Sequence, residues 1–159
     1  MHGEPARDGA AVRFPPPLVP LIALALGVGL RLVAASPPIV PAGAMRFAAA
    51  FVLSVAGLGL MAAAMRLFRA TGQDPKPWEA TPAIIATGIY RFTRNPMYLG
   101  MGLLQAGIGC GLGNGWVVAL VPISWLVIYW IAIRHEEAYL THKFGRVYQD
   151  YKASVRRWI

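Results

Sequence analysis

Four apolar stretches, separated by shorter polar or proline-rich connections, dominate the chain. They cover residues 18–35, 45–68, 97–113 and 116–133. Each is close to the roughly 20 residues that an α-helix needs to cross the hydrocarbon core of a bilayer. Because only Gly-Asn-Gly separates the last two, we expect them to form a tight helical hairpin. The pattern predicts an all-α, polytopic membrane protein with about four transmembrane helices.

The segment from Arg134 to the end of the chain has a different pattern. Its apolar side chains recur at spacings of three and four, with basic residues between them and a break at Gly145: Tyr139, Leu140, Phe144, Val147, Tyr148, Tyr151, Val155 and Trp158. That periodicity is typical of an amphipathic helix. We therefore expect a cytoplasmic C-terminal tail that lies on the membrane surface instead of crossing it.

Composition supports a membrane protein and argues against other classes. Hydrophobic residues make up 57% of the chain and charged residues 14%. The net charge of +8 could indicate nucleic acid, but the basic residues flank apolar runs, which favours anionic lipid headgroups as partners. Cys110 is the single cysteine, and the three histidines show no zinc-site spacing. We expect neither a metal site nor nucleic-acid binding.

The distribution of charge along the connections predicts an orientation. Residues 36–43 carry no formal charge, whereas residues 66–96 and the tail are rich in arginine and lysine. The positive-inside rule then places the long connection and both termini in the cytoplasm. The alanine- and glycine-rich composition adds a bacterial inner membrane as the expected location. Arg31, inside the first apolar stretch, either extends to the interface or pairs within the helix bundle.

Small residues are frequent in the third apolar stretch. Its glycines are Gly100, Gly102, Gly107, Gly109, Gly111 and Gly113. Small residues at such spacings allow helices to approach closely in lipid, either within one chain or between chains.

Two polar clusters border the last two apolar stretches. In "RNP", Asn95 and Pro96 suit a helix start, so the segment could be only a cap, with Arg91 and Arg94 on lipid phosphates. The second cluster, "RHEE" over residues 134–137, would meet the first if the hairpin forms. Carboxylates at a lipid boundary need partners. They could pair with the arginines, or both clusters could bind a zwitterionic ligand.

These clusters also carry a family resemblance. "TGIYRFTRNPMYLG" together with "EEAYLTHKFGRVYQDYKASVRRWI" resembles the isoprenylcysteine carboxyl methyltransferase family. That family belongs to a group of integral-membrane methyltransferases that includes the phospholipid methyltransferases. The resemblance covers residues 87–159 and implies S-adenosylmethionine as cofactor, held between the last membrane helices and the tail. We expect a single domain, 1–159, with an extended lead-in over 1–17, two spans in 18–68 and the cofactor-binding half in 87–159.

The resemblance implies roles for individual positions. Three features of the family are matched: its cofactor-pocket pattern "Y-R-x-x-R-H-P-x-Y-x-G", its paired glutamates and its tail aromatics. The matching residues are Tyr90, Arg94, Asn95, Tyr98, Gly100, Glu136, Glu137, Tyr148 and Tyr151. Arg94 and Glu137 are the expected catalytic residues, and Arg91 is expected to steer an anionic acceptor. Asn95 departs from the family, which has histidine there. Its amide can form hydrogen bonds but cannot carry a proton.

The function expected from these residues is methyl transfer from S-adenosylmethionine to a lipid-like or prenyl-like acceptor. Isoprenylcysteine-type carboxyl O-methylation is the first candidate, because a carboxylate is ionised at neutral pH and needs no general base. A phospholipid amine, the alternative acceptor, must first lose a proton, for which Glu136, Glu137 and His135 are the candidate bases. A non-catalytic membrane scaffold, whose polar clusters only pair with each other and with headgroups, is the competing class.

Overall fold

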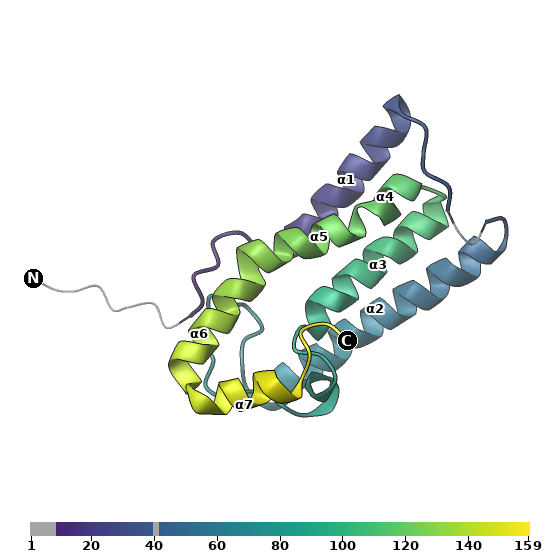
Figure 1. The fold of residues 1–159 in the computed structure, drawn as a ribbon. Coiled ribbons are helices and arrows are strands. Elements are labelled where there is room, and N and C mark those ends of the chain that lie inside the picture. Colours follow the sequence, from purple (N-terminus) through teal and green to yellow (C-terminus); the bar gives the residue numbers. More distant parts are fainter. Residues whose placement is uncertain (1–8, 40–41) are drawn as a thin grey trace, which may run out of the picture.

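The computed structural model describes residues 9–39 and 42–159, and within these ranges the protein is helical and contains no strands (Figure 1). This confirms the predicted all-α class. The elements are α1 Leu18–Val33, α2 Met45–Ala70, the short 3₁₀ turn η1 Gly88–Arg91, α3 Pro96–Leu112, α4 Gly115–Ala119, α5 Val121–Ile128, the π-helical segment η2 Tyr129–Ile133, α6 Arg134–Phe144 and α7 Arg146–Ser154.

Two of these helices are long and apolar enough to cross a membrane. They are α2 and the run from α4 to α6, Gly115–Phe144, which extends well past the predicted end of the fourth stretch. Helix α1 is apolar but has only 16 residues, and α3 has 17. Large apolar side chains on α1, α2 and α5 are exposed, including Leu32 at 82% and Phe51 at 70%. An apolar surface of this kind fits contact with lipid.

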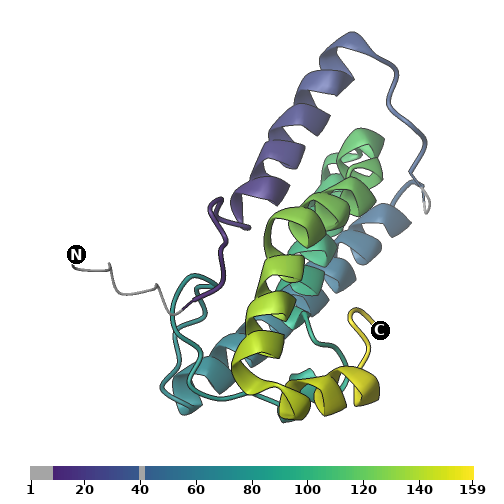
Figure 2. The ribbon, with the colours of Figure 1, turned by 60° about the vertical axis from the view of Figure 1, so that its left-hand side comes forward.

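Glycines allow α2 and α3 to pack against each other along their length (Figures 1 and 2). A Cβ atom on Gly100 would lie 2.6 Å from the carbonyl oxygen of Gly57, and one on Gly107 would lie 2.9 Å from that of Ala50. Both distances are too short for a side chain, so only glycine permits this backbone approach. The predicted helix packing through small residues is confirmed within one chain.

Polar side chains in the helix bundle have partners close to a helix break. The run from α4 to α6 is interrupted at Leu120, next to Pro122, which has no N–H group to donate. Gln105, which is 1% exposed, donates from Nε2 to the carbonyl of Val117 at 3.1 Å. Its Oε1 accepts a hydrogen bond from Ser124 at 2.9 Å. The polar side chains of Gln105 and Ser124 therefore have hydrogen-bond partners at this break.

Arg31 binds the C-terminal end of α3. Its Nη1 donates to the carbonyl oxygens of Leu112 at 2.8 Å and Gly113 at 3.1 Å. The last carbonyls of a helix lack intrahelical partners and carry partial negative charge, so a guanidinium is favourable there. Arg31 therefore has partners within the protein, although its side chain is exposed.

The two ends of the chain differ from their predicted forms. Residues 1–8 of the predicted lead-in lie outside the described residues, and the described part is packed instead of merely extended. Ala10 donates its N–H to Pro77 at 2.9 Å, and Ala10 and Val12 are buried against Ile128 and neighbouring apolar residues. In the tail, α6 continues the long helix, and the chain turns at Gly145 so that only α7 runs crosswise (Figures 1 and 2).

Candidate functional site

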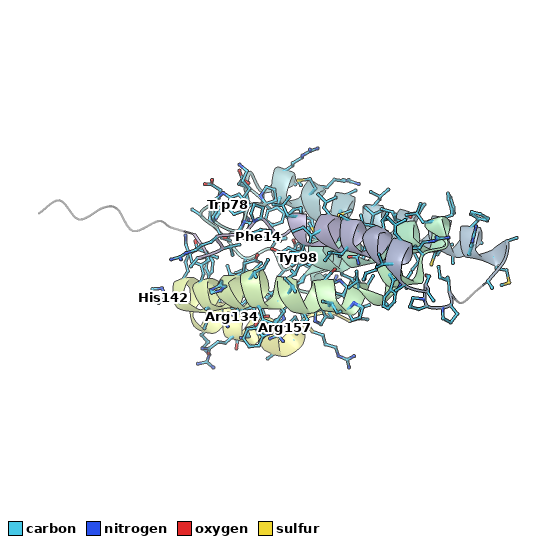
Figure 3. All side chains as sticks on the ribbon, turned by 90° about the horizontal axis from the view of Figure 1, so that it is seen from above. Phe14, Trp78, Tyr98, Arg134, His142 and Arg157 are labelled. Carbon is cyan, nitrogen blue, oxygen red and sulfur yellow. The ribbon has the colours of Figure 1, made fainter. Side chains whose placement is uncertain are left out.

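A cavity of about 290 Å³ lies at the end of the bundle where α3 begins. Its walls come from the lead-in, the connection between α2 and η1, the start of α3, α6 and α7. The predicted cofactor residues that line it are Tyr90, Arg94, Asn95, Tyr98, Glu136, Tyr148 and Tyr151. Figure 3 shows Tyr98 within the bundle, Phe14 and Trp78 on one side of α6, and Arg157 on the other. The two polar clusters of the sequence therefore meet in the fold.

Arg94 brings to this cavity a guanidinium whose hydrogen-bond donors are incompletely satisfied. Its side chain is only 9% exposed, and Nη1 lies 3.2 Å from Oε1 of Glu137. Even so, neither Nε nor Nη1 has a hydrogen-bond partner of good geometry among the described residues. Leaving buried charged donors unpaired is costly, because they lose the hydrogen bonds that water would provide. Arg94 is therefore prepared to receive an acceptor from a ligand.

Glu137 lies beside the cavity at the centre of an ion-pair cluster. Its Oε1 and Oε2 accept from Nε and Nη2 of Arg157 at 2.9 and 3.0 Å, and Nζ of Lys152 lies 4.0 Å from Oε2. The hydrogen bonds to Glu137 raise the pKa of Arg157. Glu137 is absent from the cavity lining, which departs from its predicted place in the pocket. The ion-pair interpretation describes this carboxylate.

Glu136, the adjacent residue, faces the cavity instead. It is half-buried, and its Oε1 accepts a hydrogen bond from the hydroxyl of Tyr98. Tyr98 is itself fixed, because Trp125 donates from Nε1 to its backbone carbonyl at 3.1 Å. The π-helical segment η2 ends directly before α6, and such segments are frequent at functional sites. Glu136 is therefore a carboxylate held in a fixed position on the cavity wall.

Asn95 is the residue before α3, and Pro96 takes the first helical position as predicted. The expected side-chain cap is wrong, since among the described residues Asn95 makes no cap hydrogen bond. Its Nδ2 donates to the carbonyl of Arg157 at 3.0 Å, and the hydroxyl of Thr93 donates to the same oxygen at 3.2 Å. The backbone N–H of Arg94 donates to the carbonyl of Arg156 at 3.0 Å. These three hydrogen bonds hold the C-terminal segment against the start of α3.

Three tyrosines connect α7 to the region before α3. Tyr151 donates its hydroxyl to the carbonyl of Tyr90 at 2.8 Å, and the ring centroids of Tyr148 and Tyr151 are 6.0 Å apart. Tyr148 is 3% exposed. Its burial, and then the charge of Glu137, raise its pKa to about 12. The phenol of Tyr148 therefore stays protonated near neutral pH, and that of Tyr151 acts as a hydrogen-bond donor.

Besides Glu137, two predicted site residues lie outside the cavity lining, and one wall of the cavity was not predicted from the sequence. Gly100 is part of the α2–α3 contact, and Arg91 is exposed outside the cavity lining. The missed wall is the connection between α2 and η1 together with the lead-in, which contribute Pro16, Pro17, Gln73, Trp78, Thr81, Ile84 and Ile85 among others. The backbone N–H of Thr81 donates to the hydroxyl of Tyr139 at 3.2 Å, which ties this connection to α6. No periodicity in the connection indicates this contact.

Metal binding has no structural basis in the described part of the chain. Within residues 9–39 and 42–159, no group of three or more histidine, cysteine, aspartate or glutamate side chains is placed to hold a metal ion. The polar side chains that line the cavity are arginine, lysine, glutamate, aspartate, tyrosine, threonine and amide groups.

Comparison with known proteins gives a consistent family. A protein of Haemophilus influenzae, described as an uncharacterized protein, is 43% identical over 63 residues, which are 40% of this chain and all of that protein. No solved structure matches the chain significantly. The family model "Phospholipid methyltransferase" matches residues 45–147, well over half of the chain. The match confirms the group that the sequence resemblance indicated: the chain belongs to the phospholipid methyltransferase family of membrane methyltransferases.

Proposed function

We propose that the protein is an S-adenosylmethionine-dependent methyltransferase that acts on a lipophilic acceptor. One observation carries the proposal: the buried Nε and Nη1 of Arg94 have no hydrogen-bond partner among the described residues. Arg94 and Glu136 line the same cavity. A guanidinium and a carboxylate in one cavity suit a ligand that carries both charges. The family to which the chain belongs transfers methyl groups, which gives such a ligand a chemical role.

The residues of the cavity fit the cofactor in kind. Arg94 would hold its carboxylate, and Glu136 would accept from its ammonium group or its ribose hydroxyls. Apolar side chains such as Phe68 and Ile84 line other parts of the cavity and suit a nucleobase. When bound, the cofactor supplies a methyl group on a sulfonium centre. The protein's own contribution to such a displacement is positioning and the exclusion of water.

Individual residues would share that contribution. Tyr148 and Tyr151 cover the cavity from α7, and the packed lead-in covers it from the N-terminal side. Glu137 does not line the cavity, so we now assign it as a positioning residue that holds Arg94, in place of the catalytic role expected from the family. Asn95 lines the cavity while its side-chain amide holds the C-terminal segment, so we assign it no proton transfer.

The cavity suits two classes of methyl acceptor. A lipophilic carboxylate of the isoprenylcysteine type is ionised at neutral pH and needs no base. A phospholipid amine is the second candidate, favoured by Glu136, which lines the cavity and could take the proton that an ammonium must lose. Neither His135 nor Glu137 is among the described lining residues. We further propose four membrane spans with both termini cytoplasmic, in a bacterial inner membrane, which places the cavity at the cytoplasmic face where the acceptor enters from the bilayer.

Product chemistry tests the proposal. The purified protein in lipid nanodiscs is incubated with methyl-labelled S-adenosylmethionine and either a prenylated cysteine or phosphatidylethanolamine. A methyl ester releases labelled methanol in base, whereas a methylated amine keeps its label. Arg94→Met, which keeps an unbranched apolar stem but removes the donors, is the loss-of-function control. A folded wild-type protein that neither binds S-adenosylmethionine nor transfers the label would support the scaffold alternative.

A further inference from the structure

Gln73 is a buried amide on the cavity wall that the mechanism above does not use. It follows the C-terminal end of α2, and its backbone N–H donates to the carbonyl of Phe68 at 2.9 Å. The residue is 8% exposed, and its Oε1 has no hydrogen-bond partner among the described residues. A buried carbonyl oxygen without a donor is unfavourable in a folded protein. Because Gln73 lines the cavity, a bound ligand can supply that donor.

The residues around Gln73 indicate which kind of hydrogen-bond donor a ligand would present to its Oε1. Phe68 lies five residues before Gln73 in the sequence, and Phe68 and Tyr90 form an edge-to-face pair with centroids 6.1 Å apart. Both rings line the same cavity. Of the charged side chains that line the cavity, Asp74 and Lys76 pair with each other at 3.3 Å, and Arg94 and Glu136 suit a carboxylate and an ammonium. A neutral acceptor beside aromatic rings is better matched to a neutral N–H donor on a flat, apolar ring.

We propose that Gln73 recognises the adenine base of the cofactor, an inference that rests on the proposed function. A glutamine amide has an acceptor oxygen and an NH₂ donor side by side, and adenine offers the complementary amino group and ring nitrogen. Oε1 would accept from the exocyclic amino group while Nε2 donates to the adjacent ring nitrogen. The connection between α2 and η1 would then determine specificity for the nucleobase, although it lies outside the segment that resembles the family pattern.

The test compares two ligands that differ at a single position of the base. Titration calorimetry measures the affinities of S-adenosylhomocysteine and of its 6-deamino (purine riboside) analogue, in which a hydrogen atom replaces the amino group. For the wild type we expect the adenine ligand to bind about tenfold more tightly or better, the effect of leaving one buried polar group unpaired. In Gln73→Met, which keeps the chain length without polar atoms, the two affinities should become equal. Gln149→Met, at an exposed position of α7, should retain the wild-type preference.

Each other outcome overturns a defined part of the reasoning. Equal affinities in the wild type, or an unchanged preference in Gln73→Met, would overturn the role of Gln73 while leaving the proposed function intact. If Gln73→Met does not fold, Gln73→Leu provides a second substitution, and equal affinities in the wild type overturn the role of Gln73 without any variant. Absence of binding by both ligands to folded wild-type protein would overturn the proposed function and the role of Gln73 together.

Discussion

Removing the charge of Glu137 should destabilise the protein and weaken cofactor binding together. In Glu137→Gln, the guanidinium of Arg94 loses its anionic partner at 3.2 Å while its side chain remains 9% exposed. Breaking a buried ion pair costs about 3–5 kcal/mol, because one charge stays buried without compensation. The side chains of Arg157 and Lys152 are 36% and 37% exposed, so water would partly replace their contacts. We therefore expect a loss of about 3 kcal/mol in the free energy of unfolding, the lower end of that range.

The assay is denaturant unfolding in mixed micelles, followed by far-ultraviolet circular dichroism. Asp150→Asn is the matched control, since it removes a carboxylate from an exposed position of α7 in the same tail. Arg157→Gln completes a double-mutant cycle with Glu137→Gln. Residues joined by a bidentate ion pair should show a coupling free energy of about 1–3 kcal/mol.

Cofactor affinity supplies the second measurement on the same variant. Because Glu137 holds Arg94 in the cavity wall, its loss should raise the dissociation constant of S-adenosylmethionine by about tenfold or more, or about 1.4 kcal/mol. A Glu137→Gln protein with stability within about 0.5 kcal/mol of the wild type, the range of ordinary surface substitutions, would refute the ion-pair argument. Normal stability with lost binding would instead return Glu137 to the catalytic role.

The remaining predictions concern three neighbouring positions. Arg94→Lys keeps the charge but loses the planar set of donors, so calorimetry should show weaker binding of S-adenosylmethionine, about tenfold, with little change in stability; unchanged affinity would exclude a direct role for the guanidinium. Asn95→Asp replaces the donor to the carbonyl of Arg157 with an acceptor, so limited proteolysis should cut the C-terminal segment faster than in the wild type; an unchanged rate would mean that this hydrogen bond does not hold the segment. Gly100→Ala places a Cβ 2.6 Å from the backbone of α2 and should cost about 1–3 kcal/mol of stability, whereas Gly59→Ala, with open space around it, should be neutral or stabilising in the same unfolding assay. Equal effects of the two alanines would contradict the close α2–α3 contact.

The helices were predictable because a membrane helix leaves a long apolar signal in the sequence. The start of α2 at Met45 and of α3 at Pro96 lie within a residue of the predicted stretches. The fourth stretch was predicted too short, because the polar residues of α6 end the apolar signal while the helix continues to Phe144. Hydropathy reports which residues suit lipid, whereas a helix persists as long as its backbone hydrogen bonds and packing do.

The polar half of the site was also predictable, whereas the connection between α2 and η1 was not. Arg94 and Glu136 belong to clusters whose residue types indicate charge recognition, Tyr90 was expected from the family resemblance, and the cavity brings the three together. Residues 71–87 contain prolines and no periodic pattern, so nothing local in the sequence indicates that they fold back over the bundle. Their position depends on long-range contacts such as Ala10 to Pro77. Contacts of this kind are a property of the assembled fold.

The paired glutamates illustrate how neighbouring residues acquire different functions from one helix. Consecutive residues of an α-helix point about 100° apart, so Glu136 and Glu137 on α6 necessarily face different surroundings. Glu136 contacts Tyr98 and lines the cavity, and Glu137 contacts Arg157 and Arg94 beside it. Glu137 holds the buried guanidinium of Arg94, and Tyr98 holds Glu136 on the cavity wall. Arg94 and Glu136 therefore both line the cavity, a combination of opposite charges that suits a zwitterionic ligand.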